Sequence, residues 1–533
     1  MIADQTRFSA CREPGLWCRR EPGRFGFEDP ERSFDRLVTV TQSARSGRAD
    51  GARVTRLWRS IFSEVGRPRM IYLTVPAAWV PNIEGTLSMT QRTIGIDLAI
   101  RGYHVAQIYN DGRISGRPIR FRHDAASLGR LVCCIRDGLK DGDSVQAVME
   151  PTGMSWFPVA HNLIDAGIDV VRVKGKRVKA LRRYLSEHAK TDLADAQVLA
   201  AIPGFGGPRL DPVHIPVARS HALQRLTKQR GRFKDDVSAA KRRLLDLIRW
   251  ASPDLEQILP DLGTHLSLSL LRHWLDPKTV LKTRRPTLRK FVAEHASGNH
   301  PHSGPFVEML VEGLRQAAQQ AQAIHGRHVD FEALQIEVAL EIDIVLNKLS
   351  AIAALDRRIA ALYDELDPKS LLKSIPGVGQ HLAPTILGVL HTVQRFRSER
   401  HIRGFCGLFP KRADSGGIER SGQQITQSGN DRVKRALMLA ADAARRIDPE
   451  LAEIYWRLMT TKGHHHKQAL CAVANRLANR ILSVLRRGTP YVLRDKDGNE
   501  MTIAQAKALI NTHYTVPESI RAGRRSNRYE LEE

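Results

Sequence analysis

Four acidic residues stand where their side chains could bind a metal ion together. Asp97 ends the apolar run "TIGID", and Glu150 ends "SVQAVME" in the same way. Asp192 and Asp195 follow in "KTDLADAQVLA", three residues apart, so they share one face of a helix. Carboxylates brought together repel one another unless a cation lies between them, and Mg²⁺ is a cation that oxygen ligands suit. The set predicts a site for two Mg²⁺ ions that would hold the attacking and leaving oxygens of a phosphodiester.

Each acid also has a simpler interpretation. Asp192 and Asp195 could merely complement the dipole of the helix they begin. Asp97 could be an ordinary acid at a strand end. The order along the chain, a strand Asp, a later strand Glu and then the helical pair, is more specific than any single member.

The elements around these acids alternate between strand and helix. "TIGIDLAI" and "YHVAQIY" are predicted strands, and Asn110-Asp111-Gly112 before "RISGRPIRF" indicates a hairpin. A helix over about 124–139, the strand "SVQAVME", a helix from about 155, the strand "DVVRV" and a helix over 175–185 complete the series. The pattern predicts an α/β RNase-H-like (RuvC-like) domain over 89–217, with a mixed sheet covered on both faces.

The rest of the chain is predicted to be helical. In 218–366, Leu355, Ile359, Leu362 and Leu366 step by four, three and four, which is typical of either a coiled-coil seam or an ordinary buried helix face. Two long helices there would form an antiparallel arm or an oligomer contact. A helical carboxy-terminal domain follows over 367–515, and 516–533 is a polar tail that we expect to be disordered.

The first 88 residues differ in composition from the rest of the chain. They contain fourteen Arg and no Lys and have no sustained helical or strand period. They could be a disordered basic arm, or a mis-annotated leader with the true start at Met70 or Met89; the abrupt change favours the leader.

Charge indicates the class of partner. Lys and Arg number 82 against 57 Asp and Glu, a net charge of +25, which favours nucleic acid. The six cysteines show no CxxC or paired His spacing, which argues against zinc and disulfides. No segment is long and apolar enough for a membrane span. The sequence predicts a cytoplasmic, nucleoid-associated protein with no membrane partner.

Further candidates lie near the carboxy terminus. Ser415, in "GLFPKRADSGGIERSG", could be a nucleophile, although from the residues alone a plain flexible loop is the stronger interpretation. Gly377 and Gly379 in "IPGVG" resemble the turn of a helix-hairpin-helix, which contacts DNA phosphates. The basic residues predicted to contact nucleic acid are Lys411, Arg412, Arg420, Arg432, Lys434 and Arg435.

Residues 91–495 resemble the DEDD transposases of the IS110 (IS-one-ten) insertion-sequence family, most closely its IS-eleven-eleven branch. The motifs that carry the resemblance are "IGIDLA", "MEPTG", "KTDLADAQVLA", "SIPGVGQHLAPTIL", "FCGLFPKRADSGG" and "NDRVKRALMLAA". The resemblance implies that the acidic tetrad is Asp97, Glu150, Asp192 and Asp195 and that Ser415 is the nucleophile. It also implies a phosphoserine link to DNA, a composite site from two subunits of a dimer or tetramer, and a structured bridge RNA that specifies the DNA.

Two features depart from the family pattern. The 88-residue leader is foreign to it. After the serine, Gln427-Ser428-Gly429-Asn430 replaces an expected basic turn, which puts one phosphate contact in doubt.

Three other functions compete with the transposase. A RuvC-like junction nuclease that uses water would need no Ser415. A relic that only binds nucleic acid would show no cleavage. An actin-like ATPase or sugar kinase would require a glycine-rich DxGG strand, which the sequence lacks.

Overall fold

The structure is a computed structural model of the chain. It describes residues 89–185, 191–206, 210, 212–259, 261–296, 304–411, 414–415, 418–419, 423–495 and 497–523. The segment expected to be a leader, 1–88, lies outside the described residues.

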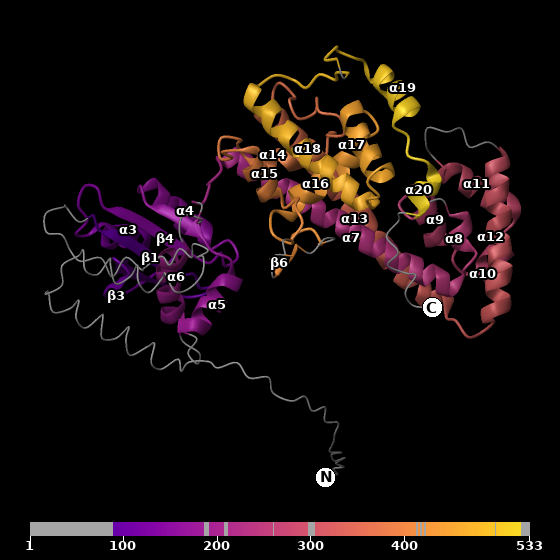
Figure 1. The fold of residues 1–533 in the computed structure, drawn as a ribbon. Helices are drawn as coiled ribbons and strands as arrows, with labels where there is room; N and C mark the ends of the chain where they lie inside the picture. The colour runs from indigo at the N-terminus through magenta and orange to yellow at the C-terminus, as the bar shows by residue number, and fades with distance from the viewer. Residues whose placement is uncertain are drawn as a thin grey trace, which may run out of the picture. The chain divides into compact units, whose positions relative to one another are not determined.

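Five strands form one mixed sheet (Figure 1). They are β1 (Gln91–Asp97), β2 (His104–Asn110), β3 (Arg113–Phe121), β4 (Ser144–Met149) and β5 (Asp169–Arg172), in the order β3-β2-β1-β4-β5. The first three are antiparallel neighbours, and β4 and β5 run parallel to β1. Asp111 and Gly112 have φ of 50° and 78°, as a type I′ turn requires, so the predicted hairpin is confirmed. The predicted mixed sheet is confirmed.

Helices cover both faces of this sheet. On one face Ile94, Ile96 and Met149 share a core with α3 (Ala125–Arg136) and α4 (Trp156–Asp165). On the other face Val148 and Val171 pack with α5 (Gly175–Leu185) and α6 (Asp192–Gly206). Since successive side chains alternate between faces, Asp97 and Glu150 belong to the α5–α6 face.

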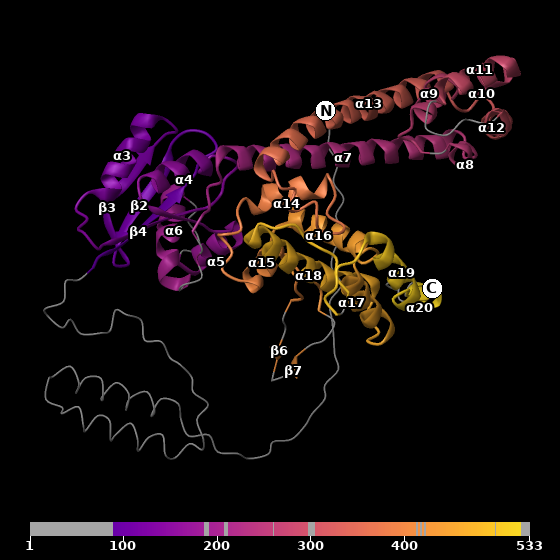
Figure 2. The ribbon, with the colours of Figure 1, turned by 90° about the horizontal axis from the view of Figure 1, so that it is seen from above.

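Two long helices pair beyond the sheet (Figure 2). They are α7 (Ala218–Ala251) and α13 (Phe331–Leu366). Ion pairs join Arg219 to Glu365 and Arg243 to Glu341, so the start of α7 lies at the end of α13 and the pair is antiparallel. Here Ile359 and Leu362 pack on Leu223 of α7, and Leu387 of a third helix joins them. At this end the predicted seam is therefore part of a three-helix core, and a two-helix coiled coil stays a prediction.

Five helices lie between α7 and α13 in the chain. They are α8 (Leu255–Ile258), α9 (His265–His273), α10 (Pro277–Lys282), α11 (Arg285–His295) and α12 (Gly304–His325). Their leucines and valines form one core with the far halves of α7 and α13. That core does not include any sheet residue.

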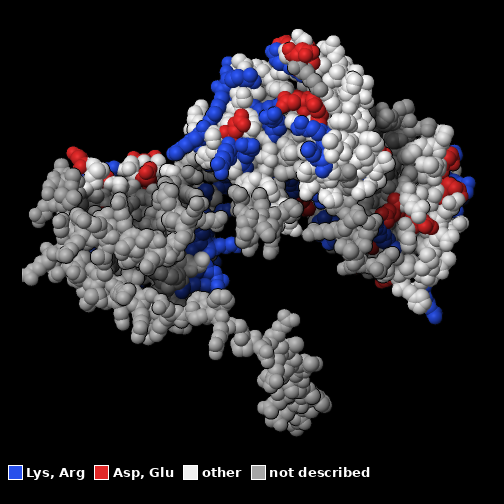
Figure 3. All heavy atoms as spheres, in the orientation of Figure 1, with Lys and Arg blue, Asp and Glu red and all other residues white. Residues whose placement is uncertain are grey.

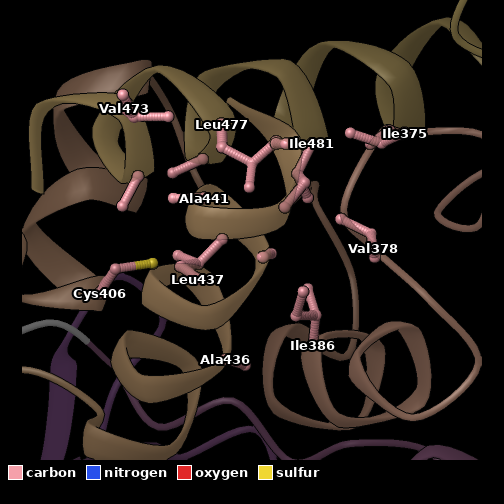
Figure 4. Close-up of a cluster of buried hydrophobic side chains, with 14 of the residues drawn as sticks. Ile375, Val378, Ile386, Cys406, Ala436, Leu437, Ala441, Val473, Leu477 and Ile481 are labelled. Carbon is pink, nitrogen blue, oxygen red and sulfur yellow. The ribbon is translucent and has the colours of Figure 1, made fainter. Parts of the chain in front are cut away.

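The carboxy-terminal part is a helical core with one hairpin. Its elements are α14 (Leu382–Leu390), α15 (Glu399–Cys406), β6 (Asp414–Ser415), β7 (Ile418–Glu419), α16 (Asp431–Ala444), α17 (Pro449–Thr460), α18 (His466–Arg487), α19 (Ile503–His513) and α20 (Glu518–Gly523). Figure 4 shows Leu437, Leu477 and Ile481 meeting at its centre. The expected disordered tail from 516 is wrong up to 523, because Val516 and Ile520 pack on this core and α20 contacts α17.

Among the described residues, no helix is long and apolar enough to cross a membrane. The buried aliphatic positions of the long helices alternate with charged ones.

Candidate active site

The strands bring two of the predicted acids to one edge. Ile96 of β1 is the register partner of Met149 of β4, so Asp97 and Glu150, each one residue further, leave the sheet at the same level. Both strands run in the same direction, and their carboxyl ends therefore meet at this edge. The sheet alone fixes half of the predicted tetrad.

Helix α6 brings the other two acids to this edge by lying directly on β1. A Cβ at Gly95 would stand 1.8 Å from the Ala196 carbonyl oxygen and 2.3 Å from the Ala200 nitrogen, so only glycine permits this approach. The Thr93 hydroxyl, on the same face of β1, donates to the Ala200 carbonyl oxygen at 2.9 Å. The glycine of "IGID" thus serves the packing that sets α6 beside Asp97.

The first turn of α6 carries Asp192 and Asp195. Thr191 precedes it, and its hydroxyl accepts from the Ala194 N–H at 3.1 Å, as an N-cap does. The threonine in "KTDLAD" therefore starts the helix, and this start places both acids at the end of α6 that lies nearest the sheet edge.

The charges of the four acids act on one another. Burial, then the charges of Asp195, Asp192 and Glu150, raise the pKa of Asp97 to about 6. This effect requires the other three carboxylates to be near Asp97. The four acids therefore lie near enough for their charges to act on Asp97, and their role as one metal-binding tetrad stays a prediction.

Arg182 of α5 holds one of these acids. Its Nη1 donates to both oxygens of Asp195, at 2.7 and 2.9 Å, and both side chains are largely buried. In the described parts of the chain, no three His, Cys, Asp or Glu side chains are grouped closely enough to hold a metal ion as they stand. The donor set nevertheless fits a hard divalent cation, since it offers carboxylate oxygens whose repulsion a cation would relieve.

Glu150 faces the start of α5. A Cβ at Gly175 would lie 2.3 Å from the Glu150 Oε1, so this glycine makes room for the carboxylate. The helix that follows carries Lys176, Arg177 and Lys179 and no acid. A basic helix beside a cluster of acids suits a ligand that brings both phosphates and cations.

Two further features of this edge were not predicted. Arg172 ends β5, and its guanidinium stacks on Trp156 at 3.9 Å from the ring centre. His104 accepts from the Ala99 N–H at 3.0 Å and bonds His123 at 3.0 Å, which fixes the loop after Asp97. Arg172 stands near the end of the predicted strand "DVVRV", much as Asp97 and Glu150 end theirs, so the same reasoning could have identified it. The histidine pair gives no local signal in the sequence.

Ser415 lies in a hairpin rather than in the plain loop that the residues alone favoured. It pairs with Ile418, and Asp414 pairs with Glu419, while Pro410 and Ile425 form a bridge at the root. Only the backbone of 414–415 and 418–419 is described. Gly416 and Gly417, which stand between the two strands in the sequence, lie outside the described residues.

The predicted phosphate-binding glycines differ in their surroundings. Gly377 has φ of 82°, and a Cβ there would lie 2.2 Å from the Ala440 carbonyl oxygen, so packing on α16 explains this glycine. Gly379 is exposed and has open space around it. Phosphate binding stays a prediction for both, and Gly379 has the more suitable surroundings.

The predicted basic residues also differ in their partners. Arg432 donates to the Gln224 carbonyl oxygen at 3.0 Å, and Lys434 donates to the Thr426 carbonyl oxygen at 3.1 Å. Arg435 pairs with Asp235 at 3.5 Å. Lys411 is exposed, whereas Arg412 and Arg420 lie outside the described residues.

The departure at 427–430 has a structural role. Gly429 has φ of 96°, and a Cβ there would lie 2.7 Å from the Gly407 nitrogen. The Asn430 side chain caps α16 by accepting from the Arg432 and Val433 N–H groups. This turn thus fixes the start of α16 with polar and small residues.

Two family models match the chain. Residues 94–253 match a DEDD transposase model of IS110 type, and residues 369–456 match the model of the IS116/IS110/IS902 transposase family. The chain is 24% identical over 363 residues to the uncharacterized 43.6 kDa protein of insertion element IS110 from Streptomyces coelicolor, covering 68% of this chain and 86% of that protein.

Two other similarities are weaker or shorter. A pilin gene-inverting protein of Moraxella lacunata is 29% identical over 183 residues, 33% of this chain and 57% of that one. RuvC of T. thermophilus, solved with a Holliday junction substrate, matches 23% of this chain and 99% of its own at 16% identity, with a TM-score of 0.19, too low to carry weight. Over residues 94–253 and 369–456 the chain is thus similar to transposases of the IS110/IS116/IS902 family.

Proposed function

We propose that this chain is a DEDD transposase of the IS110/IS116/IS902 family and that it cuts and rejoins DNA through a serine–phosphodiester link. The matches over 94–253 and 369–456 support this proposal. The observation that carries the proposal is the placement of the acids: Asp97 and Glu150 follow paired positions of β1 and β4, and α6, whose first turn carries Asp192 and Asp195, packs directly on β1. Four converging carboxylates are the feature that phosphodiester chemistry with divalent cations requires.

The tetrad is the part of the site proposed to hold metal. Two Mg²⁺ ions held by Asp97, Glu150, Asp192 and Asp195 would lower the cost of forming a serine alkoxide and stabilise the charge on the pentavalent phosphorus. Arg182 keeps Asp195 oriented and partly neutralised when no cation is bound. Gly95 holds α6 on β1, so the relative positions of the acids come from the fold.

Ser415 is the proposed nucleophile. Its hydroxyl releases a proton to solvent, its oxygen bonds to phosphorus, and the bond from phosphorus to the leaving sugar oxygen breaks. That oxygen takes up a proton, so charge and atoms balance. Attack by the hydroxyl of a second strand reverses these steps, frees the serine and rejoins the DNA.

Assembly and guidance are inferred from the resemblance. The serine and the tetrad stand in different parts of the chain, and we propose that they meet in a composite site formed by two subunits of a dimer or tetramer. A structured bridge RNA would specify the target and donor DNA by base pairing. The protein would then need to recognise charge and shape more than base sequence.

The test is the covalent adduct. The full chain, Mg²⁺, DNA carrying the gene's own flanking segments and RNA transcribed from those segments should give a protein–DNA adduct that survives denaturation. Mass spectrometry should locate the nucleotide on Ser415. Ser415→Ala should abolish the adduct, whereas Ser421→Ala, in the same stretch, should keep it.

Two outcomes would contradict the proposal. Full cleavage by Ser415→Ala would favour a RuvC-like junction nuclease that uses water. Binding without any cleavage by the wild-type chain would favour a relic that only binds nucleic acid.

Asp192→Asn should lower cleavage by at least about 10²-fold with DNA binding retained. Asp165→Asn, which changes an exposed acid at the end of α4, should change neither cleavage nor binding.

A further inference from the structure

Basic side chains occur over much of the helical surface, mixed with acidic ones (Figure 3). Some of these basic side chains are neutralised by an ion pair, whereas others have no acidic partner among the described residues. On α7, the arginines that face α13 are neutralised: Arg219 pairs with Glu365, Arg230 with Asp356 and Arg243 with Glu341. These arginines tie the two long helices together.

Another face of α7 behaves differently. Arg225, Lys228 and Arg232 are spaced by three and four residues, so they lie on one side of the helix, and all three are exposed. Arg432 of α16 joins them, because its guanidinium bonds the carbonyl oxygen of Gln224 on α7. We call these four cations the α7–α16 basic cluster.

No carboxylate in the described part of the chain forms an ion pair with any member of this cluster. The nearest acid of α7 on this side, Asp235, pairs with Arg435 at 3.5 Å instead. Partial burial and the neighbouring charges of Arg232, Arg432 and Arg225 lower the pKa of Lys228. Four like charges gathered without a counter-ion are unfavourable, and a bound anion would relieve them.

The cluster lies beside the root of the Ser415 hairpin. Lys434, two residues after Arg432, donates to the Thr426 carbonyl oxygen, and the Thr426 N–H donates to the Phe409 carbonyl oxygen at 2.9 Å. The hairpin leaves the helices between Phe409 and Thr426. An anion on the cluster is thus held next to the segment that carries the serine.

We propose that the α7–α16 basic cluster binds backbone phosphates of the DNA strand that Ser415 attacks. The inference rests on the proposed function for the identity of that strand. Repeated phosphates spaced along a backbone match cations spaced along one face of a helix, and Arg and Lys are the usual phosphate ligands. The cluster positions the strand; it takes no part in bond making.

The experiment measures binding without cleavage. Fluorescence anisotropy of the full chain is recorded in EDTA with a labelled duplex from the gene's own flanking DNA, over a series of salt concentrations. Lys228→Gln with Arg232→Gln should weaken binding roughly tenfold and reduce the slope of log K against log salt by about 1 to 2. Arg243→Gln, a neutralised arginine of the same helix, is the matched control and should change neither.

Three results decide the matter. Unchanged affinity and slope in the double variant, with an unchanged unfolding midpoint, would overturn the inference. If the double variant lost affinity only for RNA transcribed from the same flanking segments, the inference would also be overturned, and the cluster would be assigned to RNA binding. A loss of DNA binding, together with a wild-type chain that forms no Ser415 adduct, would overturn the proposed function and leave the cluster as a DNA-binding site.

Discussion

The sheet edge and the Ser415 hairpin, which carry the two halves of the proposed chemistry, are built in opposite ways. The acids of the edge come from β1, β4 and α6, and contacts between elements far apart in the sequence bring them together. The serine sits in a ladder of two residue pairs closed within one short segment. The half proposed to bind metal is fixed by tertiary packing, whereas the half that carries the proposed nucleophile depends on local pairing.

The largest expected effect is on packing at the edge. Gly95→Ala would place a Cβ against the backbone of Ala196 and Ala200, so α6 must move away from β1. We expect a loss of about 3 kcal/mol in the free energy of unfolding, measured by urea denaturation. Cleavage should fall with it because Asp192 and Asp195 move with α6.

Gly129→Ala is the control for that loss. Gly129 lies in α3 with nothing near its Cβ position, so alanine there should be neutral or stabilising by up to about 1 kcal/mol. Equal losses in the free energy of unfolding for Gly95→Ala and Gly129→Ala would show that the close packing of α6 on β1 is not the cause.

A smaller effect is expected at the Arg182–Asp195 pair. Arg182→Gln removes both charged hydrogen bonds to Asp195, and repulsion within the tetrad grows. We expect a loss of about 1–2 kcal/mol without divalent ions, and Mg²⁺ should raise the melting temperature more than it does in the wild type. If Mg²⁺ raises the melting temperatures of the wild type and of Arg182→Gln equally, Arg182 does not substitute for a cation.

Arg249→Gln serves as the comparison. It removes a pair of similar hydrogen bonds to Glu256, but the arginine side chain is 54% exposed. The loss in the free energy of unfolding should be smaller than in Arg182→Gln, because solvent screens this pair, and Mg²⁺ should have no special effect.

The smallest effect on stability is expected in the hairpin. Ser415→Ala should change the free energy of unfolding by less than about 0.5 kcal/mol, because the ladder is local and the core of the carboxy-terminal part lies in its helices. Calorimetry on the variant checks this. A loss of several kcal/mol would mean that the serine is part of the fold, and its effect on chemistry would then be indirect.

The sequence predicted the sheet edge well for physical reasons. Strand periodicity assigns Asp97 and Glu150 to one face, and the three-residue spacing assigns Asp192 and Asp195 to one turn. Arg182 could not be predicted as the partner of Asp195, because that contact depends on how α5 packs beside α6. The same holds for the His104–His123 pair.

The carboxy-terminal part was harder to predict. Gly377 looked like a phosphate-binding glycine, and its closest neighbour is the backbone of α16. The helix at Glu518–Gly523 was not predicted, because the segment is short and mostly polar. Only two apolar side chains, Val516 and Ile520, pack it on the core. The hairpin at Ser415 was read as a loop, since two residue pairs are too few for a strand period to be visible.

Divalent-ion binding by the full chain tests the central claim most directly. The spectrum of free Mn²⁺, followed by electron paramagnetic resonance, should show binding that is lost in Asp97→Asn and Asp192→Asn and kept in Asp165→Asn. Because the pKa of Asp97 is about 6 in the folded chain and 3.8 otherwise, its charge disappears as pH falls through 6, and Mn²⁺ binding should weaken there. Without metal, the same raised pKa contributes stability at low pH that is lost as pH rises through 6. Mn²⁺ binding equal in the wild type and all three variants would contradict a divalent site built from these four acids.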